Sequence, residues 1–328
     1  MFAIHRCLGG MRAAAILAIV LCAAAHGAEQ TFPERPLRLL APYGAGGSYD
    51  GLARLLAQKL SEQFGQQVVV DNRVGASGRI GMAIAIKMPA DGYNVFILGN
   101  TQTIVPSVYK TSPYDLTKDI QPITMIAFIT NVLVIHPSVP AKTTEEFVAL
   151  AKAKPGTIRF GSGGTGGITH LAGELFGSLS QTQVVHVPYK FGAAAMNALL
   201  GNEVQFNILN MLNAAPHVRS GKLRGLAVTG LKRSEFLPEL PTLNDSGVKG
   251  YEIVEFYAMA APVGLSKPLL TRLHTEMVKA VGAPDFQASL KKVSAEPVTM
   301  TPQETHRFIL AEQAKYAAIV KSVGITAD

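Results

Sequence analysis

The chain has 328 residues, of which 48% are hydrophobic and 16% charged, with a formal net charge of +7 at pH 7. This length is more than one hydrophobic core usually carries, so two domains are expected. The basic residues form no block and alternate with no aromatic platform, which argues against a nucleic-acid-binding function.

Residues 1–27 are predicted to be a secretory signal peptide. Arg6 and Arg12 supply the positive start, an apolar run follows over residues 13–25, and the small residues Ala25 and Gly27 suit a signal peptidase site. A permanent transmembrane anchor is the competing interpretation, but a span needs roughly 20 apolar residues. We therefore expect export to the periplasm.

Removal of this segment leaves a mature chain without thiols. Cys7 and Cys22 are the only cysteines, so no disulfide or cysteine metal site is expected in the mature protein. Lipidation of Cys22 is a third interpretation of this region, disfavoured because bulky Leu21 precedes it. Losing two arginines leaves a mild positive excess, which suits an anionic small ligand without requiring one.

Strands and helices alternate at the start of the mature chain. Strands are predicted over three apolar stretches, Leu37–Pro42, Val68–Val70 and Val95–Leu98. Helices are predicted between them, from the spacing of Leu52, Leu55, Leu56 and Leu60 and from the stretch Gly81–Met88. This order predicts a doubly wound α/β fold with a parallel sheet and ligand positions at the carboxyl ends of its strands.

The first strand leads into a glycine-rich turn that we call the first corner, Tyr43–Asp50. Gly44, Gly46 and Gly47 allow the backbone to approach a ligand closely, and the unpaired N–H groups of the following helix start face the same point. A carboxylate or phosphate would fit there without an arginine. A tight turn that binds nothing is the competing interpretation.

Two further strand ends carry short polar residues. The second strand ends at Asp71 and Asn72, and the third runs into Asn100, Thr101 and Gln102. Because these ends share one edge of a parallel sheet, they are expected to lie near the first corner. Asp71 and Asn72 are expected to orient loops instead of contacting a ligand.

The pattern restarts after a long apolar run. Ile123–Ile135 is predicted to be a strand or linker that passes from one domain to the other. Thr143 and Thr144 are candidate N-caps for a helix over Glu145–Lys154.

A strand at Arg159–Ser162 then enters a second glycine-rich turn, the second corner, Ser162–His170. Gly161, Gly163 and Gly166 form a G-x-G-x-x-G pattern, but the next strand ends in His186-Val187-Pro188 without the acidic residue that a dinucleotide site needs. Backbone N–H groups, three hydroxyls and a helix start remain, all suited to an oxygen anion. Two such corners predict a ligand held between them.

The rest of the chain completes two lobes joined by two crossings. Further strands are predicted at Val184–Val187, Val204–Leu209, Leu226–Thr229 and Glu252–Ala261, and helices at 268–281, 284–293 and 302–323. The chain is expected to cross back near Val254–Ala258, so that the C-terminal helices pack on the first domain. The predicted lobes are residues 28–130 with 256–328, and residues 131–255, around a central cleft.

At these corners the sequence resembles the Bug receptors, the extracytoplasmic solute-binding proteins of tripartite tricarboxylate transporters. The resemblance covers nearly the whole mature chain and is carried by seven segments: Pro33–Arg54, Val68–Gly81, Pro113–Thr124, Phe160–Phe176, Val187–Lys190, Gly221–Gly247 and Phe256–Pro268. It implies a type II periplasmic-binding-protein fold, a carboxylate gripped largely by backbone N–H groups, and delivery to membrane permease subunits.

The resemblance also implies a set of ligand-binding residues. Carried over position by position, it comprises Tyr43, Gly44, Ala45, Gly46, Gly47, Ser48, Tyr49, Asp50, Asn100, Thr101, Ser162, Gly163, Gly164, Thr165, Gly166, Thr169, His170, Tyr189, Phe191 and Asn210. Three positions depart from the family pattern. Tyr49 replaces a small residue, Phe191 a glycine and Leu209 an aspartate, so an aromatic or less polar acid becomes a candidate ligand.

Other functions have weaker support in the sequence. No G-x-S-x-G, H-E-x-x-H or cysteine nucleophile is present, and the histidines lack metal spacing. We expect no enzyme activity, cofactor or metal, and a monomer. A sensor subunit for a membrane kinase and an enzyme on the same fold are the alternatives.

Overall fold

The computed structural model describes residues 32–326. The chain divides into a short unit, Met1–Arg35, and a large unit, Pro36–Asp328, and the elements below all belong to the large unit. The predicted signal peptide lies outside the described residues. Within residues 32–326, no helix combines the length and the hydrophobicity that a membrane span requires.

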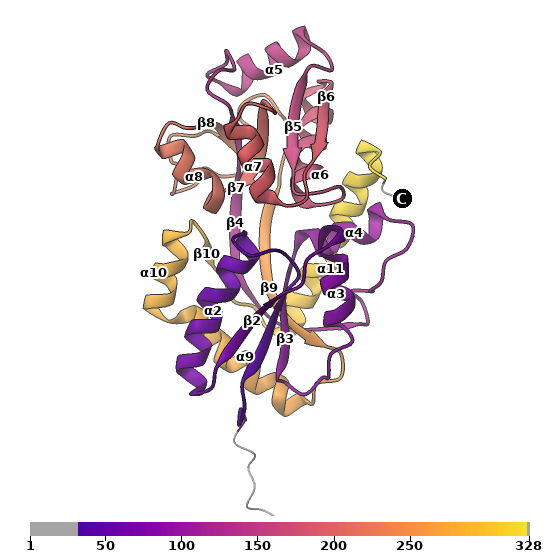
Figure 1. The fold of residues 1–328 in the computed structure, drawn as a ribbon, viewed down its shortest axis with the longest axis vertical. Coiled ribbons are helices and arrows are strands. Elements are labelled where there is room, and N and C mark those ends of the chain that lie inside the picture. The colour runs from indigo at the N-terminus through magenta and orange to yellow at the C-terminus, as the bar shows by residue number, and fades with distance from the viewer. Residues whose placement is uncertain (1–31, 327–328) are drawn as a thin grey trace, which may run out of the picture. The chain divides into compact units, whose positions relative to one another are not determined.

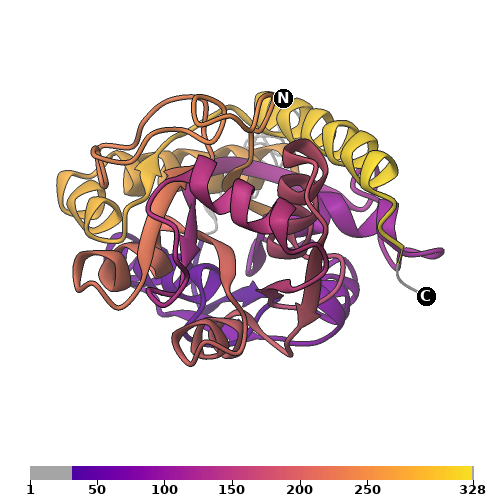
Figure 2. The same ribbon diagram turned by 90° about the horizontal axis from the view of Figure 1, so that it is seen from above.

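The large unit has the predicted α/β fold, built on one ten-stranded sheet (Figures 1 and 2). The strands are β1 Leu37–Ala41, β2 Val68–Asn72, β3 Asn94–Gly99, β4 Ile120–Ile135, β5 Ile158–Ser162, β6 Val184–Pro188, β7 Phe206–Asn210, β8 Arg224–Val228, β9 Val254–Pro262 and β10 Glu296–Pro297. Their order is β2-β1-β3-β9-β4-β7-β5-β6, with β8 and β10 also paired to β4.

Helices cover both halves of this sheet. They are α2 Ser48–Phe64, η1 Ala76–Gly78, α3 Arg79–Ala85, α4 Asn100–Val108, α5 Thr144–Ala153, α6 Ile168–Ser180, α7 Gly192–Leu200, α8 Met211–Arg219, α9 Lys267–Gly282, α10 Pro284–Lys292 and α11 Pro302–Val323. Capping explains several bounds. Thr143, one of the two predicted N-caps, accepts the Glu146 N–H, and Thr301 with Glu304 forms a capping box.

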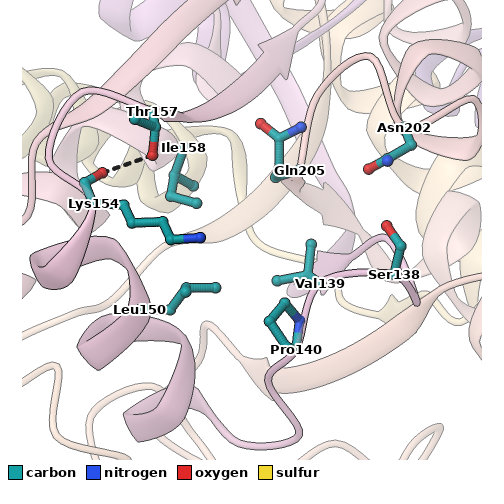
Figure 3. Close-up of a pocket in the computed structure, with 9 residues that line it drawn as sticks. All are labelled: Ser138, Val139, Pro140, Leu150, Lys154, Thr157, Ile158, Asn202 and Gln205. Carbon is teal, nitrogen blue, oxygen red and sulfur yellow. Dashed lines mark hydrogen bonds between the residues drawn. The ribbon is translucent and has the colours of Figure 1, made fainter.

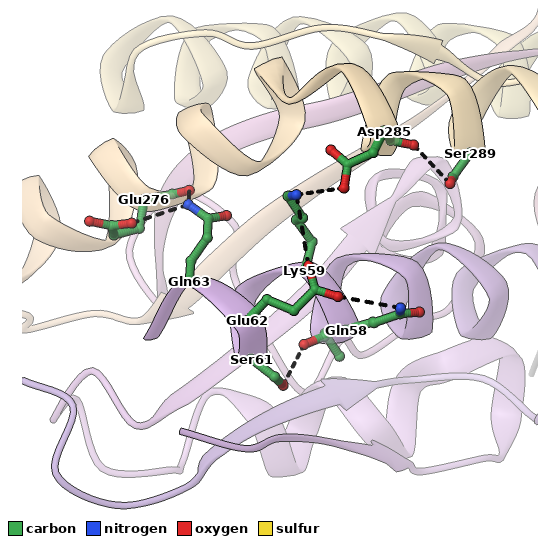
Figure 4. Close-up of polar contacts among 9 residues, drawn as sticks. Gln58, Lys59, Ser61, Glu62, Gln63, Glu276, Asp285 and Ser289 are labelled. Carbon is green, nitrogen blue, oxygen red and sulfur yellow. Dashed lines mark hydrogen bonds and ion pairs between the residues drawn. The ribbon is translucent and has the colours of Figure 1, made fainter. Parts of the chain in front are cut away.

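The first lobe is built on β1, which pairs in parallel with β2 and β3. Leu52, Leu56 and Leu60 of α2 are fully buried, as their spacing predicts, whereas Leu55 is only partly buried. On the outer side of α2, Lys59 lies 2.6 Å from Asp285 of α10, and Gln63 donates to Glu276 of α9 (Figure 4). The helix that begins at the first corner is therefore held by the C-terminal helices.

The second lobe repeats this arrangement around β5, which pairs in parallel with β6 and β7. Its core is aromatic: the rings of Phe147, Phe160, Phe176 and Phe206 pack with centroids 5.2 to 5.9 Å apart. Gly173 lets α6 approach Phe160, because a Cβ there would lie 2.2 Å from the ring.

Two long strands join the lobes. The apolar run predicted as a strand or linker is one continuous strand, β4, which pairs with β9 up to Thr130 and with β7 and β8 from Asn131 onward. In Figure 1, β4 and β9 run side by side from the lower to the upper group of elements. These strands are the two crossings.

The last helix corrects one prediction, because α11 packs on both lobes. Ile309 belongs to the core of the first lobe, whereas Tyr316 and Val320 belong to the core cluster that contains Phe147 and Phe176, and α11 contacts α6. A 22-residue helix is about 33 Å long at 1.5 Å per residue, long enough to reach both cores. Helices α9 and α10 contact the first lobe, as predicted.

Sequence reasoning also missed α4, treating Asn100–Gln102 as a polar strand end. Pro106 inside the helix and four polar residues at its start obscure the apolar spacing of Ile104, Val105 and Val108, all of which are buried. The helix matters for function because its first turn reaches the second corner.

Candidate functional site

The first corner is held in shape by side chains, with Asp50 at its centre. Asp50 Oδ2 accepts the Gly46 N–H at 2.9 Å and the Arg54 Nε–H at 3.0 Å. Burial alone would raise the pKa of this carboxyl, but the bonds from Arg54 and Gly46 outweigh it and lower the pKa. Asn72 donates to Tyr43 O at 2.9 Å. These bonds hold the corner in shape, and the bond from Asn72 agrees with the loop-orienting role expected for that residue.

The start of α2 presents free backbone donors at this corner. Gly51 N–H donates to Gly47 O, and in the described chain no hydrogen bond is found for the N–H groups of Ser48, Tyr49 and Asp50. These are the unpaired donors of a helix N-terminus, and with the helix dipole they favour an anion.

The second corner uses more of its donors internally. Three N–H groups donate to side chains of the same corner: Gly163 to Thr169, Gly164 to Ser162 and Gly166 to His170. A fourth, Ile168 N–H, donates to Thr101 of the first lobe at 3.3 Å. The two corners therefore differ, and the second keeps fewer backbone donors for a ligand.

The two corners meet at the junction of the lobes through the loop Gly75–Gly78. Tyr43 OH, in the first corner, donates to Ser77 O at 3.2 Å. Ser77 Oγ in turn donates to Thr165 O of the second corner at 2.7 Å, and Tyr109 OH donates to the same oxygen at 3.2 Å. A chain of hydrogen bonds thus connects Tyr43 to Thr165.

This connecting loop has an unusual backbone. Ala76 and Ser77 have φ of +46° and +53°, and φ is also positive at Gly75 and Gly78. Left-handed φ costs a non-glycine residue about 1–2 kcal/mol. The loop holds that conformation where Ser77 touches the second corner, and such strain is common at ligand-binding sites.

Three tyrosines line the first-lobe side of the junction. The ring of Tyr49 lies 4.3 Å from that of Tyr43 and 4.9 Å from that of Tyr257. Tyr49 fits because Gly99 has no side chain: a Cβ there would lie 2.5 Å from its hydroxyl oxygen. Burial raises the pKa of all three phenols, so they act as neutral hydrogen-bonding groups.

A row of polar side chains crosses the sheet beside these tyrosines. Asn131 of β4 pairs in register with Asn210 of β7, and Glu255 of β9 pairs with Ile129, two residues from Asn131 on the same face. Tyr257 OH donates to Glu255 and lies 2.8 Å from Ser48 Oγ. Glu255 and Asn131 are 3% and 0% exposed.

Sequence reasoning missed Glu255, Asn131 and Ser77. One signal was available: Glu255 is the only charged residue in the apolar strand Val254–Pro262. Burial raises the pKa of its carboxyl, which interactions with Tyr257, Asn210 and Asn131 partly offset.

Two histidines stack behind the second corner. The rings of His170 and His186 are 3.7 Å apart, and Ser162 Oγ lies 2.6 Å from His186 Nε2. Burial, and to a lesser extent His170, lowers the pKa of His186 to about 3. His186 is thus neutral at ordinary pH and lies beside Ser162 of the second corner. No cluster suited to a metal ion is found within residues 32–326.

The other predicted site residues take different positions. The Asn100 amide accepts the Phe256 N–H and donates to Val254 O and Tyr316 OH, so it holds β9 against α11. Phe191 is 52% exposed at the start of α7. Gly161 has no side chain, and a Cβ added there would lie 3.3 Å from the ring of Tyr189.

A surface hollow in the second lobe is unrelated to these residues (Figure 3). It is lined by Ser138, Val139, Pro140, Leu150, Lys154, Thr157, Ile158, Asn202 and Gln205. Ile158 begins β5, whereas the second corner follows its last residue, Ser162. The hollow therefore lies at the opposite edge of the sheet from the corners.

Comparisons with known proteins identify the family. Residues 52–325 match the model of the "Tripartite tricarboxylate transporter family receptor". Protein BugT of Bordetella pertussis is 32% identical over 92% of this chain and 93% of its own length. The solved structure "R. palustris Rpa4515 with adipate" is 34% identical, covering 90% of this chain and 99% of that one with a TM-score of 0.86.

The periplasmic binding protein BugD is similar to the same degree. Its structure is 30% identical, with 90% of this chain and 100% of that chain covered and a TM-score of 0.85. On these matches, the predicted resemblance is confirmed: the chain belongs to the tripartite tricarboxylate transporter receptor family, the Bug solute-binding proteins.

Proposed function

We propose that this protein captures a small organic carboxylate at the junction of its lobes and delivers it to the permease subunits of a tripartite tricarboxylate transporter. The observation that carries the proposal is the first corner, where the N-terminus of α2 has free N–H groups in the described chain and Tyr43 bonds to Ser77, which bridges to Thr165. The similar R. palustris protein was solved with adipate, which is in keeping with a carboxylate ligand.

The grip is mainly electrostatic and uses backbone groups. The N–H groups of Ser48, Tyr49 and Asp50 supply donors and the positive end of the α2 dipole. Thr165 and Thr169 of the second corner complete the site from the other lobe. Such a cradle binds the carboxylate group common to many acids, so the ligand's remaining part is selected by the side chains around it.

Binding is coupled to closure of the lobes about β4 and β9. The lobe boundaries that we propose, at residues 130/131 and 255/256, lie where β4 changes its pairing partner and within the first residues of β9. A ligand that contacts both corners only when they meet favours the closed form by its difference in affinity for the two forms. The protein acts in the periplasm as a monomer after signal-peptide removal.

Isothermal titration calorimetry of the mature protein against mono-, di- and tricarboxylates tests the proposal. We expect at least one acid to bind and to raise the Tm in proportion to its affinity. The absence of both binding and stabilisation for every acid of the panel would refute it.

A matched pair of aspartate variants tests the first corner specifically. Asp50→Asn removes the charge that anchors Gly46 and Arg54, so the corner loosens and every binding acid should lose affinity by a similar factor. Asp285→Asn removes an exposed aspartate that pairs with Lys59 on the outer side of α2, and should leave affinity unchanged. Equal effects of the two variants would contradict the assignment.

An enzyme on this fold is the second candidate, because Ser162 lies within hydrogen-bond distance of His186. A serine nucleophile needs a base that takes its proton near neutral pH. With a pKa of about 3, His186 is too weak a base for that role. Incubation of the protein with each bound acid, followed by mass spectrometry, should show no conversion.

A further inference from the structure

His170 accepts a backbone hydrogen bond inside the second corner. Its Nδ1 accepts the Gly166 N–H at 3.1 Å, and the residue is 6% exposed. A ring nitrogen that accepts a bond carries no proton, so in the neutral ring the proton is on Nε2. Glu174 Oε1, one turn further along α6, lies 3.6 Å from Nε2, and its negative charge favours a proton there. These contacts select one tautomer of His170.

The same peptide group contacts the first lobe through its oxygen. The Thr165 carbonyl and the Gly166 nitrogen belong to one planar trans peptide, in which the C=O and the N–H point in opposite directions. The carbonyl accepts the hydroxyls of Ser77 and Tyr109, at 2.7 and 3.2 Å. His170 on one side and the first lobe on the other thus hold a single peptide plane.

Gly166 makes this peptide plane easy to turn. Its φ is +77°, and glycine populates positive and negative φ about equally, so the backbone alone does not fix the plane. Gly166 is buried, and a buried N–H without an acceptor is costly. The direction of the Thr165 carbonyl therefore depends on the acceptor that His170 supplies.

Protonation of His170 removes that acceptor, because both nitrogens of the charged ring are donors. In the part of the chain that the structure describes, the titratable side chains against the ring are Glu174 of α6 and His186 of β6, which stacks on it at 3.7 Å. From β5 the ring is faced by uncharged Phe160. Burial, and then His170, lowers the pKa of His186 to about 3. In mildly acidic solution, His170 is thus the histidine of this pair that takes up a proton.

We propose that His170 is a positioning residue: its neutral ring, with the proton on Nε2, orients the Thr165–Gly166 peptide so that the second corner bonds to the first lobe. The inference rests on the carboxylate-binding function proposed above and adds a pH dependence to its closed form. Mild acidification releases the peptide, weakens the two bonds to the Thr165 carbonyl and lowers the affinity for the ligand.

Nitrogen NMR of the isotope-labelled mature protein, without ligand, tests the first step. At about pH 8 the His170 ring should carry its proton on Nε2 and none on Nδ1, and the Gly166 amide signal should shift together with the ring as the pH is lowered to about 5. A proton on Nδ1 at the higher pH, a ring that stays neutral throughout, or a Gly166 signal that does not follow the ring overturns the inference.

Two variants of nearly equal size test the second step. His170→Asn can place an amide oxygen where Nδ1 lies and does not titrate, whereas His170→Leu offers no acceptor. In calorimetry with acetate, adipate and citrate at about pH 8, an acid that binds should bind about tenfold more weakly to the leucine variant than to the asparagine variant, the value of one or two hydrogen bonds. At about pH 5 the unmodified protein should weaken by a similar factor relative to the asparagine variant. The ionisation of the acid itself cancels in this ratio.

His136 is the matched control, because its Nδ1 also accepts a backbone N–H, that of Ser138, at 3.2 Å. Ser138 lines the surface hollow at the opposite edge of the sheet, so His136→Leu should change neither the affinity nor its pH dependence. Far-UV circular dichroism confirms that all variants are folded. Equal affinities of the two His170 variants overturn the inference while leaving carboxylate binding intact. If no acid binds, the proposed function fails, and the NMR titration decides the role of His170.

Discussion

Replacing Gly173 by alanine should destabilise the second lobe, because α6 approaches β5 too closely for a methyl group. The Cβ would lie 2.2, 2.4 and 2.6 Å from three atoms of the Phe160 ring. That ring is fully buried and packs against Phe206 and His186, so it has little room to move. Overpacking costs about 1–3 kcal/mol, and alanine recovers roughly 1 kcal/mol of helix propensity.

The net expectation is a loss of up to about 2 kcal/mol for Gly173→Ala, which corresponds to a Tm decrease of up to a few degrees. Gly51→Ala is the matched control, since Gly51 also lies inside a helix but a Cβ there meets no atom within 4 Å. It should gain up to about 1 kcal/mol. Thermal unfolding followed by circular dichroism compares the two. An equal rise in Tm for both would refute the packing argument.

Three further predictions concern the junction. The pKa of Glu255 is raised in the fold above its usual value of 4.5, so the native state retains a proton that the unfolded state releases. The stability of the protein therefore falls as the pH rises above about 4.5. Glu255→Gln should raise the Tm at about pH 8 but not at about pH 4. Folding lowers the pKa of His186 from its usual value of 6.5 to about 3. Between these two pH values the unfolded state therefore binds a proton that the native state does not bind. Acidification toward pH 3 should then lower the Tm of the unmodified protein more than it lowers the Tm of the His186→Asn variant. Ser77→Ala and Ser77→Gly both lose the bond to Thr165, but glycine also relieves the left-handed backbone, so in urea unfolding the alanine variant should be less stable by roughly 1 kcal/mol.

The fold was predictable where local signals are strong. The last long helix was predicted over residues 302–323, the bounds that the structure has, and Thr301 with Pro302 marks its start. The leucines of α2 predicted its buried face. The sequence did not reveal that α11 reaches both lobes, because which core a given apolar residue joins depends on tertiary packing and not on spacing.

Prediction of the site was limited in the same way. Glycines mark where the backbone can turn, so both corners were located. The sequence could not show that Thr169, Ser162 and His170 would occupy three N–H groups of the second corner. Nor could it bring Glu255 and Ser48 together, since 207 positions separate them and only the crossing of β9 places them side by side.

The position of the polar row on the crossing strands links recognition to motion. Asn131 and Glu255 belong to β4 and β9, the strands about which the lobes would rotate, whereas three hydrogen bonds join the second corner to the first lobe through Ser77, Tyr109 and Thr101. At about 0.5–1.5 kcal/mol each, those three bonds would stabilise closure by roughly 1.5–4.5 kcal/mol before the cost of ordering is counted. A shift of the population from almost all open to almost all closed needs about 5.5 kcal/mol of free energy. The three bonds supply less than this, so the binding of one acid can decide which form dominates. These three bonds alone are therefore too weak to fix the closed form, so closure is expected to depend also on ligand contacts and on the packing of α11 against both lobes.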